Sequence, residues 1–271
     1  MSTPMSGPGP EPGRQPGPQL DPARSLWPEP GPQERFSLRD RTDLATIAAV
    51  VVLVFTNLSN NRWFNSWGLL TGVLTIAVLG GLVRWAGGGW RDLGLARDTL
   101  ARGAVWALAI VGVIGVVYLG AALLPLTRDL FSDQRNNALT AGGLAAKVLF
   151  YVPFGTVLLE EFAFRGTLYG LIGRRHGVIW ATAVSSFLFG LWHILPSLHL
   201  STEKPALTPL FGSSPVGAIV ADAAAVLFTG LSGVVFCELR RRSSSLLAPM
   251  GLHWATNALG YIAGYATAHL H

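Results

Sequence analysis

The run from Ala104 to Leu124 reads AVWALAIVGVIGVVYLGAALL and holds no charged residue. A helix rises about 1.5 Å per residue, so a run of this length crosses the roughly 30 Å hydrocarbon core of a bilayer. The rest of the chain is similar: half of its 271 residues are hydrophobic and only 13% are charged, whereas a soluble domain carries about a quarter charged residues. The sequence therefore predicts a membrane protein, and its net charge of +5 does not indicate nucleic-acid binding.

Six further apolar runs have roughly the length that a membrane span requires, the first only marginally. Together they predict an all-α fold, a polytopic membrane bundle of about seven transmembrane helices. An extra short or re-entrant helix over 141–152 is compatible with this count. The predicted spans are Leu44–Leu58, Trp67–Val83, Ala104–Leu124, Leu144–Ile172, Val178–Leu195, Val216–Cys237 and Leu246–Ala268.

The first 40 residues differ from this body, because they hold ten of the seventeen prolines together with many Gly, Gln and Ser. Such a segment cannot bury enough apolar surface to fold. We predict two regions: a disordered Pro/Gly-rich cytoplasmic tail over 1–40 and a transmembrane helical domain over 41–271.

Basic residues are distributed unevenly between the loops. Seven spans place twelve arginines on one side of the membrane and four basic residues on the other, so the positive-inside rule predicts a cytoplasmic N-terminus and an outer C-terminus. Arginine outnumbers lysine eighteen to two, which together with abundant Ala and Gly indicates a bacterial protein of the plasma membrane. The twelve arginines are Arg35, Arg39, Arg41, Arg84, Arg91, Arg97, Arg102, Arg174, Arg175, Arg240, Arg241 and Arg242.

Three charged residues fall inside the fourth predicted span, in the stretch Leu158–Gly166, LLEEFAFRG. A charge inside a bilayer costs about 2.5–3.5 kcal/mol on insertion scales and usually marks function. Glu161 and Arg165 are four residues apart, so they can meet and neutralise each other. Glu160 points about 100° away around the helix and is left free to face a pocket. The alternative is that all three form one structural ion cluster.

Histidines on two other spans reach a comparable depth. With a turn near Gly173–Gly177, Glu160 and His193 both lie about 20–27 Å from that turn, so a helical hairpin brings them level. His253 and Asn257 are four residues apart and share a face of the seventh span. Hydrogen bonding between spans explains each of these residues equally well when it is taken singly.

Together the four residues predict a hydrolytic site. Glu and His can bind a metal or take a proton from water near neutral pH, and Asn can donate to an oxyanion. We expect Glu160, His193 and His253 to converge on one cavity, with Asn257 beside them and the fourth, fifth and seventh spans packed together. We expect the cavity to open toward the cytoplasm or sideways to lipid, because the depths are counted from the cytoplasmic loops.

Three motifs resemble those of a known family. Glu160-Glu161-Phe-Ala-Phe-Arg165-Gly, Phe189-Gly-Leu-Trp-His193 and His253-Trp-Ala-Thr-Asn257 look like the successive motifs of the CPBP family. That family groups the type II CAAX prenyl endopeptidases with bacteriocin-processing and immunity proteins. The resemblance covers residues of about 153–260, so the domain over 41–271 is expected to be protease-like.

The resemblance implies an intramembrane endopeptidase that acts on a peptide or membrane-protein substrate. It implies that Glu160 activates water with the help of His193, that His253 and Asn257 stabilise the oxyanion, and that Glu161 and Arg165 hold the site together. The family is often described as metalloproteases, so a divalent metal, zinc first, is a candidate cofactor with Glu160, His193 and His253 as its ligands. The sequence leaves open whether a metal takes part.

Two other classes of function stay open. A non-enzymatic membrane scaffold or bacteriocin-immunity protein would use the same polar cluster only for structure or for binding a partner. A transporter would use Glu160 and Asp222 as a proton path, although the internal repeat that many transporters show is not visible here. A Glu160→Gln substitution separates these classes, because a scaffold tolerates it and a hydrolase does not.

Overall fold

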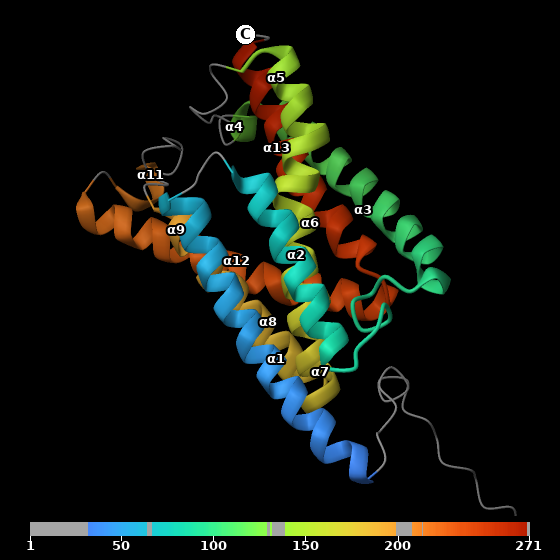
Figure 1. The fold of residues 1–271 in the computed structure, drawn as a ribbon. Helices are drawn as coiled ribbons and strands as arrows, with labels where there is room; N and C mark the ends of the chain where they lie inside the picture. The colour runs from blue at the N-terminus through green and yellow to red at the C-terminus, as the bar shows by residue number, and fades with distance from the viewer. Residues whose placement is uncertain are drawn as a thin grey trace, which may run out of the picture. The chain divides into compact units, whose positions relative to one another are not determined.

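Helices form all the regular structure in the part of the chain that the structure, a computed structural model, describes (Figure 1). That part comprises residues 32–63, 67–128, 131, 139–198, 208–212 and 214–269, and it belongs to one unit that extends from Gly31 to His271. No β-strand occurs within these ranges. The predicted all-α helical membrane fold is confirmed. The predicted tail up to residue 31 and the loop residues Arg135 and Lys204 lie outside the described residues.

The first three spans are simple helices joined by short segments. Helix α1 ends in a single π-helical turn, and a loop with left-handed glycines at Gly87 and Gly94 joins α2 to α3. The elements are α1 (Pro32–Leu58), η2 (Ser59–Trp63), α2 (Gly68–Trp85), α3 (Arg97–Leu123) and α4 (Pro125–Arg128).

The fourth span is one continuous helix from Ala141 to His176, so the extra helix considered at 141–152 is its first part. Two stretches of it have the wider π-helical hydrogen-bonding pattern, and Pro153, which has no N–H to donate, lies inside the first of them. Its parts are α5 (Ala141–Ala146), η6 (Lys147–Val157), α6 (Leu158–Glu161), η7 (Phe162–Leu168) and α7 (Tyr169–His176). This span is the centre of the bundle, because α1, α2, α8, α12 and α13 all pack against parts of it.

The remaining helices enclose the fourth span. They are α8 (Val178–Trp192), α9 (Ile194–Ser197), α11 (Thr208–Phe211), α12 (Pro215–Ser243) and α13 (Leu247–His269). All seven predicted spans correspond to helices. By length and hydropathy, five qualify as candidate membrane spans, while α8 has only 15 residues and α13, with its His, Asn, Thr and Tyr residues, is less apolar.

Helix α1 begins earlier than the boundary that we predicted. We placed residues 32–40 in the disordered tail, whereas the structure makes them helical from Pro32 onward. The physical reason is local: proline is favoured at the first helical position, and the residues after it, Gln33, Glu34 and Arg35, have good helix propensity. The correction lengthens the helix at its N-terminal end, while the candidate membrane span within it begins at Arg41.

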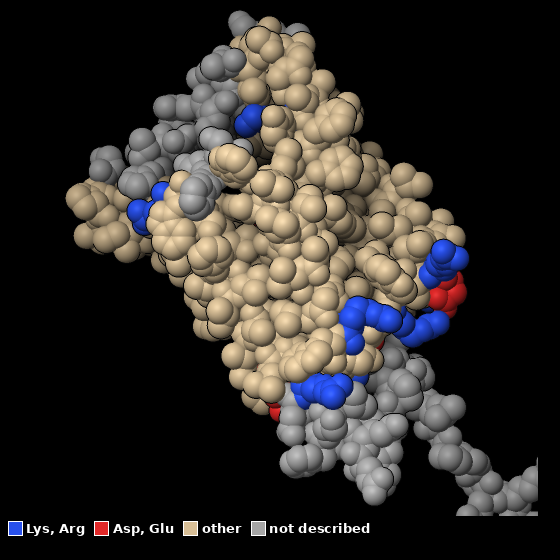
Figure 2. Space-filling view, viewed as in Figure 1, with Lys and Arg blue, Asp and Glu red and all other residues tan. Residues whose placement is uncertain are grey.

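The loops rich in arginine meet at one end of the bundle, where Lys and Arg gather in Figure 2. Arg175 forms an ion pair with Asp43 of α1 at 3.2 Å. Arg240 of α12 is buried and donates to the backbone carbonyls of Arg91 and Asp92, both at 3.1 Å. We call this end, with its loops 84–102, 174–177 and 240–245, the basic end.

Helices α3 and α13 pack closely just before His253. A Cβ atom added to Gly251 of α13 would lie 2.7 Å from the Cα of Ala107 in α3, which is closer than real Cβ atoms approach. Only glycine fits there, so Gly251 determines how near α13 lies to α3 two residues before a candidate site residue.

We predict that Gly251→Ala destabilises the protein by about 1–3 kcal/mol, because the added methyl group overpacks the α3–α13 contact. The measurement is the thermal unfolding midpoint of the detergent-solubilised protein. The matched control is Gly112→Ala in α3, where an added Cβ meets nothing within 4 Å. Equal midpoints for the two variants would contradict the close packing.

Candidate active site

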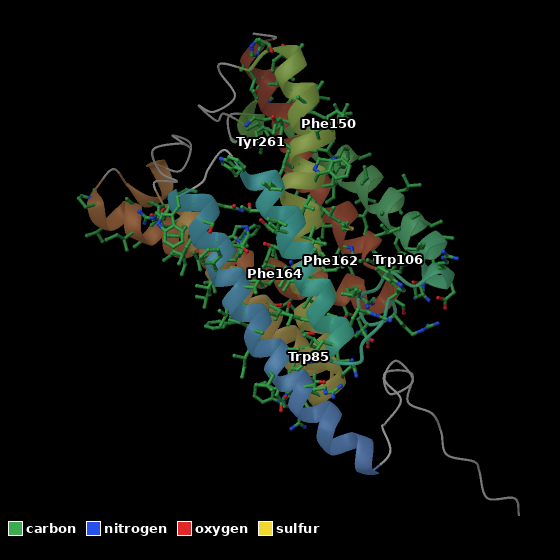
Figure 3. All side chains as sticks on the ribbon, in the orientation of Figure 1. Trp85, Trp106, Phe150, Phe162, Phe164 and Tyr261 are labelled. Carbon is green, nitrogen blue, oxygen red and sulfur yellow. The ribbon has the colours of Figure 1, made fainter. Side chains whose placement is uncertain are left out.

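The fourth span carries its charged residues at the middle of the bundle. Phe162 and Phe164 project from it there in Figure 3, whereas Tyr261 lies farther along α13 toward the C-terminus. Glu160 and Glu161 occupy α6, between the two π-helical stretches. The Glu160 side chain is 9% exposed and that of Glu161 is fully buried. Charged groups so far from water must be compensated by their neighbours.

The Glu160 carboxylate is approached from two other spans. Its Oε1 accepts a hydrogen bond from the Trp192 indole Nε1 at 3.1 Å. Its Oε2 lies 3.8 Å from Nε2 of His193 and 3.8 Å from Nε2 of His253, and it accepts no hydrogen bond although it is buried. The predicted convergence of the three residues is therefore observed, at distances that one shared water can bridge.

The second ring nitrogen of each histidine shows which nitrogen carries a proton. Nδ1 of His193 lies 2.9 Å from the carbonyl oxygen of Phe189, which can only accept, so Nδ1 carries a hydrogen and Nε2 of the neutral ring has a free lone pair. Nδ1 of His253 lies 2.8 Å from Oε1 of Glu161, which favours the same tautomer. Two basic nitrogens and a carboxylate oxygen thus face one small region.

Glu161 and Arg165 form the predicted ion pair beneath this region. Nη1 of Arg165 donates to Oε1 of Glu161 at 3.2 Å, and both side chains are fully buried. The guanidinium carbon of Arg165 also lies 3.9 Å from the ring centroid of Phe189 and 4.6 Å from that of Phe236. Attraction between the cation and these rings adds to the stabilisation of a charge that water does not reach.

A cavity of about 600 Å³ lies against Glu160, and Trp192, His193 and Asn257 also line it. Asn257 is therefore beside the site, as predicted. His253, which we expected to line the same cavity, is not among its lining residues: it is buried and lies 3.8 Å from Oε2 of Glu160. Farther from Glu160 the cavity is lined by Asn60, Asn61, Phe131 and Pro196, which lie at the end of the bundle opposite the basic end. The described lining does not reach the arginine-rich loops, so the first of the two openings that we predicted is not observed, and the alternative opening, sideways to lipid, stays a prediction.

Our error has a simple origin. Depth was counted from the basic loops, but a residue near the middle of a long span is reached from whichever side its neighbours leave open. Every residue from Leu159 to Gly173 is buried, so the chain is closed on the side that we expected to be open.

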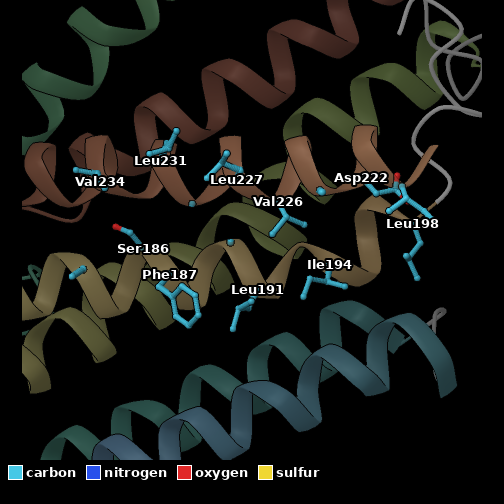
Figure 4. A pocket seen from close by; sticks show the side chains of 15 residues that line it. Ser186, Phe187, Leu191, Ile194, Leu198, Asp222, Val226, Leu227, Leu231 and Val234 are labelled. Atoms are coloured by element: carbon cyan, nitrogen blue, oxygen red, sulfur yellow. The ribbon is translucent and has the colours of Figure 1, made fainter. Parts of the chain in front are cut away.

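A larger groove of about 710 Å³ lies elsewhere, between α8 and α12 (Figure 4). Its lining is apolar apart from Ser186 and Asp222, and none of the candidate catalytic residues faces it. Glu160 and Asp222 line separate cavities, which leaves the transporter hypothesis without a shared path. Three of the candidate catalytic residues, Glu160, His193 and Asn257, line the smaller cavity.

The comparisons with known proteins bear on the same segment. Residues 142–259 match the family model described as "Type II CAAX prenyl endopeptidase Rce1-like". This segment of 118 residues, out of 271 in the chain, is similar to that family. Comparison with curated proteins and with solved structures finds no match. The matching segment begins in α5 and ends in α13, so it contains all six residues that we singled out, and the family implies a protease that acts within a membrane.

Two contacts around the Rce1-like site escaped sequence reasoning. Trp192 stands in a quoted motif, yet nothing in the sequence showed that its indole holds Glu160. Asn57 of α1, outside the Rce1-like segment, donates from Nδ2 to the carbonyl oxygen of Trp192 at 2.7 Å, where α8 ends. The only signal in the sequence was that Asn57 is a polar residue at the end of an apolar run, and this does not predict which residue it contacts.

The structure adds two contacts to the role implied for His253. The resemblance grouped it with Asn257 as an oxyanion stabiliser, and the structure places it between the two glutamates, in contact with Glu161 and near Glu160. A carboxylate that orients a histidine in this way is common behind hydrolytic and metal-binding imidazoles.

The spacing of the three candidate ligands is wider than that of a tetrahedral zinc site. Two atoms bound tetrahedrally to zinc at about 2.1 Å lie about 3.4 Å apart, less than the 3.8 Å from Oε2 of Glu160 to each histidine Nε2. Among the described residues, no group of three His, Cys, Asp or Glu side chains has a geometry that could hold a metal ion. The predicted ligand set therefore does not fit a metal in this arrangement, and we derive no step through one.

We predict that Glu161→Ala and Arg165→Ala each destabilise the protein by about 3–5 kcal/mol, because each leaves an uncompensated buried charge. Folded yield and thermal midpoint in detergent measure this. Glu160→Gln should match the wild type in both, because a glutamine oxygen can still accept from Trp192.

The control for the buried pair is Asp98→Ala, which breaks the ion pair between Arg91 and Asp98, whose side chains are 62% and 58% exposed. An exposed pair contributes little, so this variant should be as stable as the wild type. Equal losses of folded protein in Glu160→Gln and Glu161→Ala would support the purely structural cluster instead.

Proposed function

We propose that this protein is an intramembrane endopeptidase in which Glu160 activates a water molecule for attack on a peptide bond. One observation carries the proposal: Oε2 of Glu160, buried and without a hydrogen bond, lies 3.8 Å from Nε2 of both His193 and His253. A water about 2.8 Å from these atoms can donate to Oε2 of Glu160 and to Nε2 of His193, and it accepts from Nε2 of His253 when His253 is protonated. The family supports the reaction class.

In the proposed reaction, Glu160 takes a proton from this water as the water oxygen attacks the carbonyl carbon of the substrate. The C–N bond then breaks, and the proton held by Glu160 passes to the departing amine nitrogen. His193 is the less buried histidine, with 22% of its side chain exposed, and it lines the cavity, so it assists by orienting the water. Water is thereby added across the peptide bond, and the site returns to its starting state.

The developing oxyanion needs hydrogen-bond donors in a region that excludes water. Asn257 lines the cavity and supplies an amide N–H₂. His253 supplies a second donor when it is protonated, because Glu161 on its Nδ1 side compensates the charge of the imidazolium. With Glu160 and Glu161 ionised, Arg165 and a protonated His253 make the buried cluster neutral. Its charge becomes positive when Glu160 takes the proton, at the moment the substrate oxygen becomes negative.

We predict that Glu160→Gln lowers cleavage about 10²–10⁴-fold, the usual contribution of a general base, while the protein stays folded. Because the substrate is unknown, the measurement compares newly formed N-termini in membrane proteomes of cells that express the wild type or the variant. Peptides that depend on Glu160 identify the substrates.

The control is Asp222→Asn, which removes a different carboxylate from a candidate span outside the polar cavity. Its pattern of N-termini should equal that of the wild type. If the wild type and Glu160→Gln give the same N-termini at equal protein levels, the protein is a scaffold or immunity factor rather than an enzyme.

A further inference from the structure

Four segments that are far apart in sequence meet at the basic end. Arg175 contacts Asp43, Arg174 lies 4.0 Å from Asp92, and Arg102 donates to the backbone carbonyl of Arg242. These contacts tie the start of the first span, the 84–102 loop, the 174–177 turn and the α12–α13 junction to one another. The arginines of these loops therefore share one side in the folded protein, as the positive-inside rule requires of cytoplasmic loops.

The site is closed toward this end. Glu160 precedes His176, at the basic end, by sixteen residues, or about 24 Å of helix. The helix between them is buried continuously from Leu159 to Gly173. The Glu161–Arg165 pair and the rings of Phe189 and Phe236 fill the space next to it. Within the described residues, this packing fills the space between Glu160 and the arginine-rich side.

The site is open toward the other end. Asn60 and Asn61 of η2 follow the C-terminal end of α1, and Pro196 lies in α9 beyond the end of α8. All three line the same cavity as Glu160. The described part of this cavity therefore extends from Glu160 toward the side of the membrane that carries few basic residues.

The lining of this path suits a peptide backbone. Among the described residues that line it, Glu160 is the only acidic one. The amide and hydroxyl side chains of the lining can donate to peptide carbonyls and accept from peptide N–H groups. These residues are Asn60, Asn61, Tyr118, Thr156, Thr256, Asn257 and Tyr261.

From these observations we infer that substrates reach Glu160 from the extracytoplasmic side of the membrane. That the entering peptide is a substrate rests on the proposed hydrolytic function, but the direction of access does not depend on that function. The substrate class is then exported peptides, or the outer segments of membrane proteins, in an extended conformation. Peptides that stay in the cytoplasm, C-terminal tails of soluble proteins included, are not substrates.

The test is the accessibility of single cysteines. Cys237 is the only cysteine and is buried, so Cys237→Ala provides the background. Thr156→Cys places a thiol in the cavity, one helical turn before Glu160, and Arg97→Cys places one on an exposed residue at the basic end. A small membrane-impermeant maleimide is applied to right-side-out spheroplasts and to inverted membrane vesicles.

The expected result is labelling of Thr156→Cys in spheroplasts and of Arg97→Cys only in inverted vesicles, with at least a tenfold difference in rate in each case. Labelling of both from the same side would overturn the direction of the cavity. Labelling of Arg97→Cys from outside and Thr156→Cys from inside would overturn the orientation and, with it, the substrate class.

Adding Glu160→Gln to the Thr156→Cys protein separates this inference from the proposed function. Labelling should be unchanged, because access does not require hydrolysis. If labelling follows the expected pattern while the N-termini of the proteome do not depend on Glu160, the enzyme hypothesis fails and the direction of access stands.

Discussion

The rest of the site depends on the contacts that the Glu161 carboxylate makes with Arg165 and His253. This carboxylate is fully buried, and its Oε1 contacts both Arg165 on its own helix and His253 on α13. A carboxylate in such surroundings is tolerated only when positive or donating groups surround it. One oxygen atom therefore joins the central span to α13 and at the same time sets the rotation of the His253 ring.

The neighbouring contacts extend this constraint to the other spans. Arg165 lies against the rings of Phe189 on α8 and Phe236 on α12, and Phe236 stacks on His253 at 5.4 Å. The carbonyl oxygen of Phe189 also accepts a hydrogen bond from Nδ1 of His193, so Phe189 contacts both Arg165 and His193. Each glutamate keeps one oxygen, Oε2, without a hydrogen bond, and Oε2 of Glu160 is the one that lies 3.8 Å from Nε2 of both histidines.

The parts of this account that sequence could predict are those governed by helical periodicity and length. Spacing of four residues paired Glu161 with Arg165, and counting residues from a turn brought Glu160 level with His193. Contacts between distant helices could not be predicted in this way. No local sequence pattern indicates the hydrogen bond from Trp192 to Glu160 or the one from Asn57 to the carbonyl oxygen of Trp192. The direction in which the cavity opens depends on which neighbours fill the space, and a depth count carries no such information. The early start of α1 was missed because the proline-rich composition of the first 40 residues indicated disorder, although Pro32 is a residue type that is favoured in the first turn of a helix.

The central claim is that Glu160, His193 and His253 share one water while Glu161 holds His253 in place. An experimental density map of the wild-type protein that shows ordered water, with anomalous data at the zinc edge, tests it most directly. The account predicts one water peak within hydrogen-bond distance of Oε2 of Glu160 and Nε2 of both histidines, with Nδ1 of His253 on Glu161 and no anomalous signal. A His253 ring turned away from Glu160, or a zinc peak bound by these side chains, would contradict it.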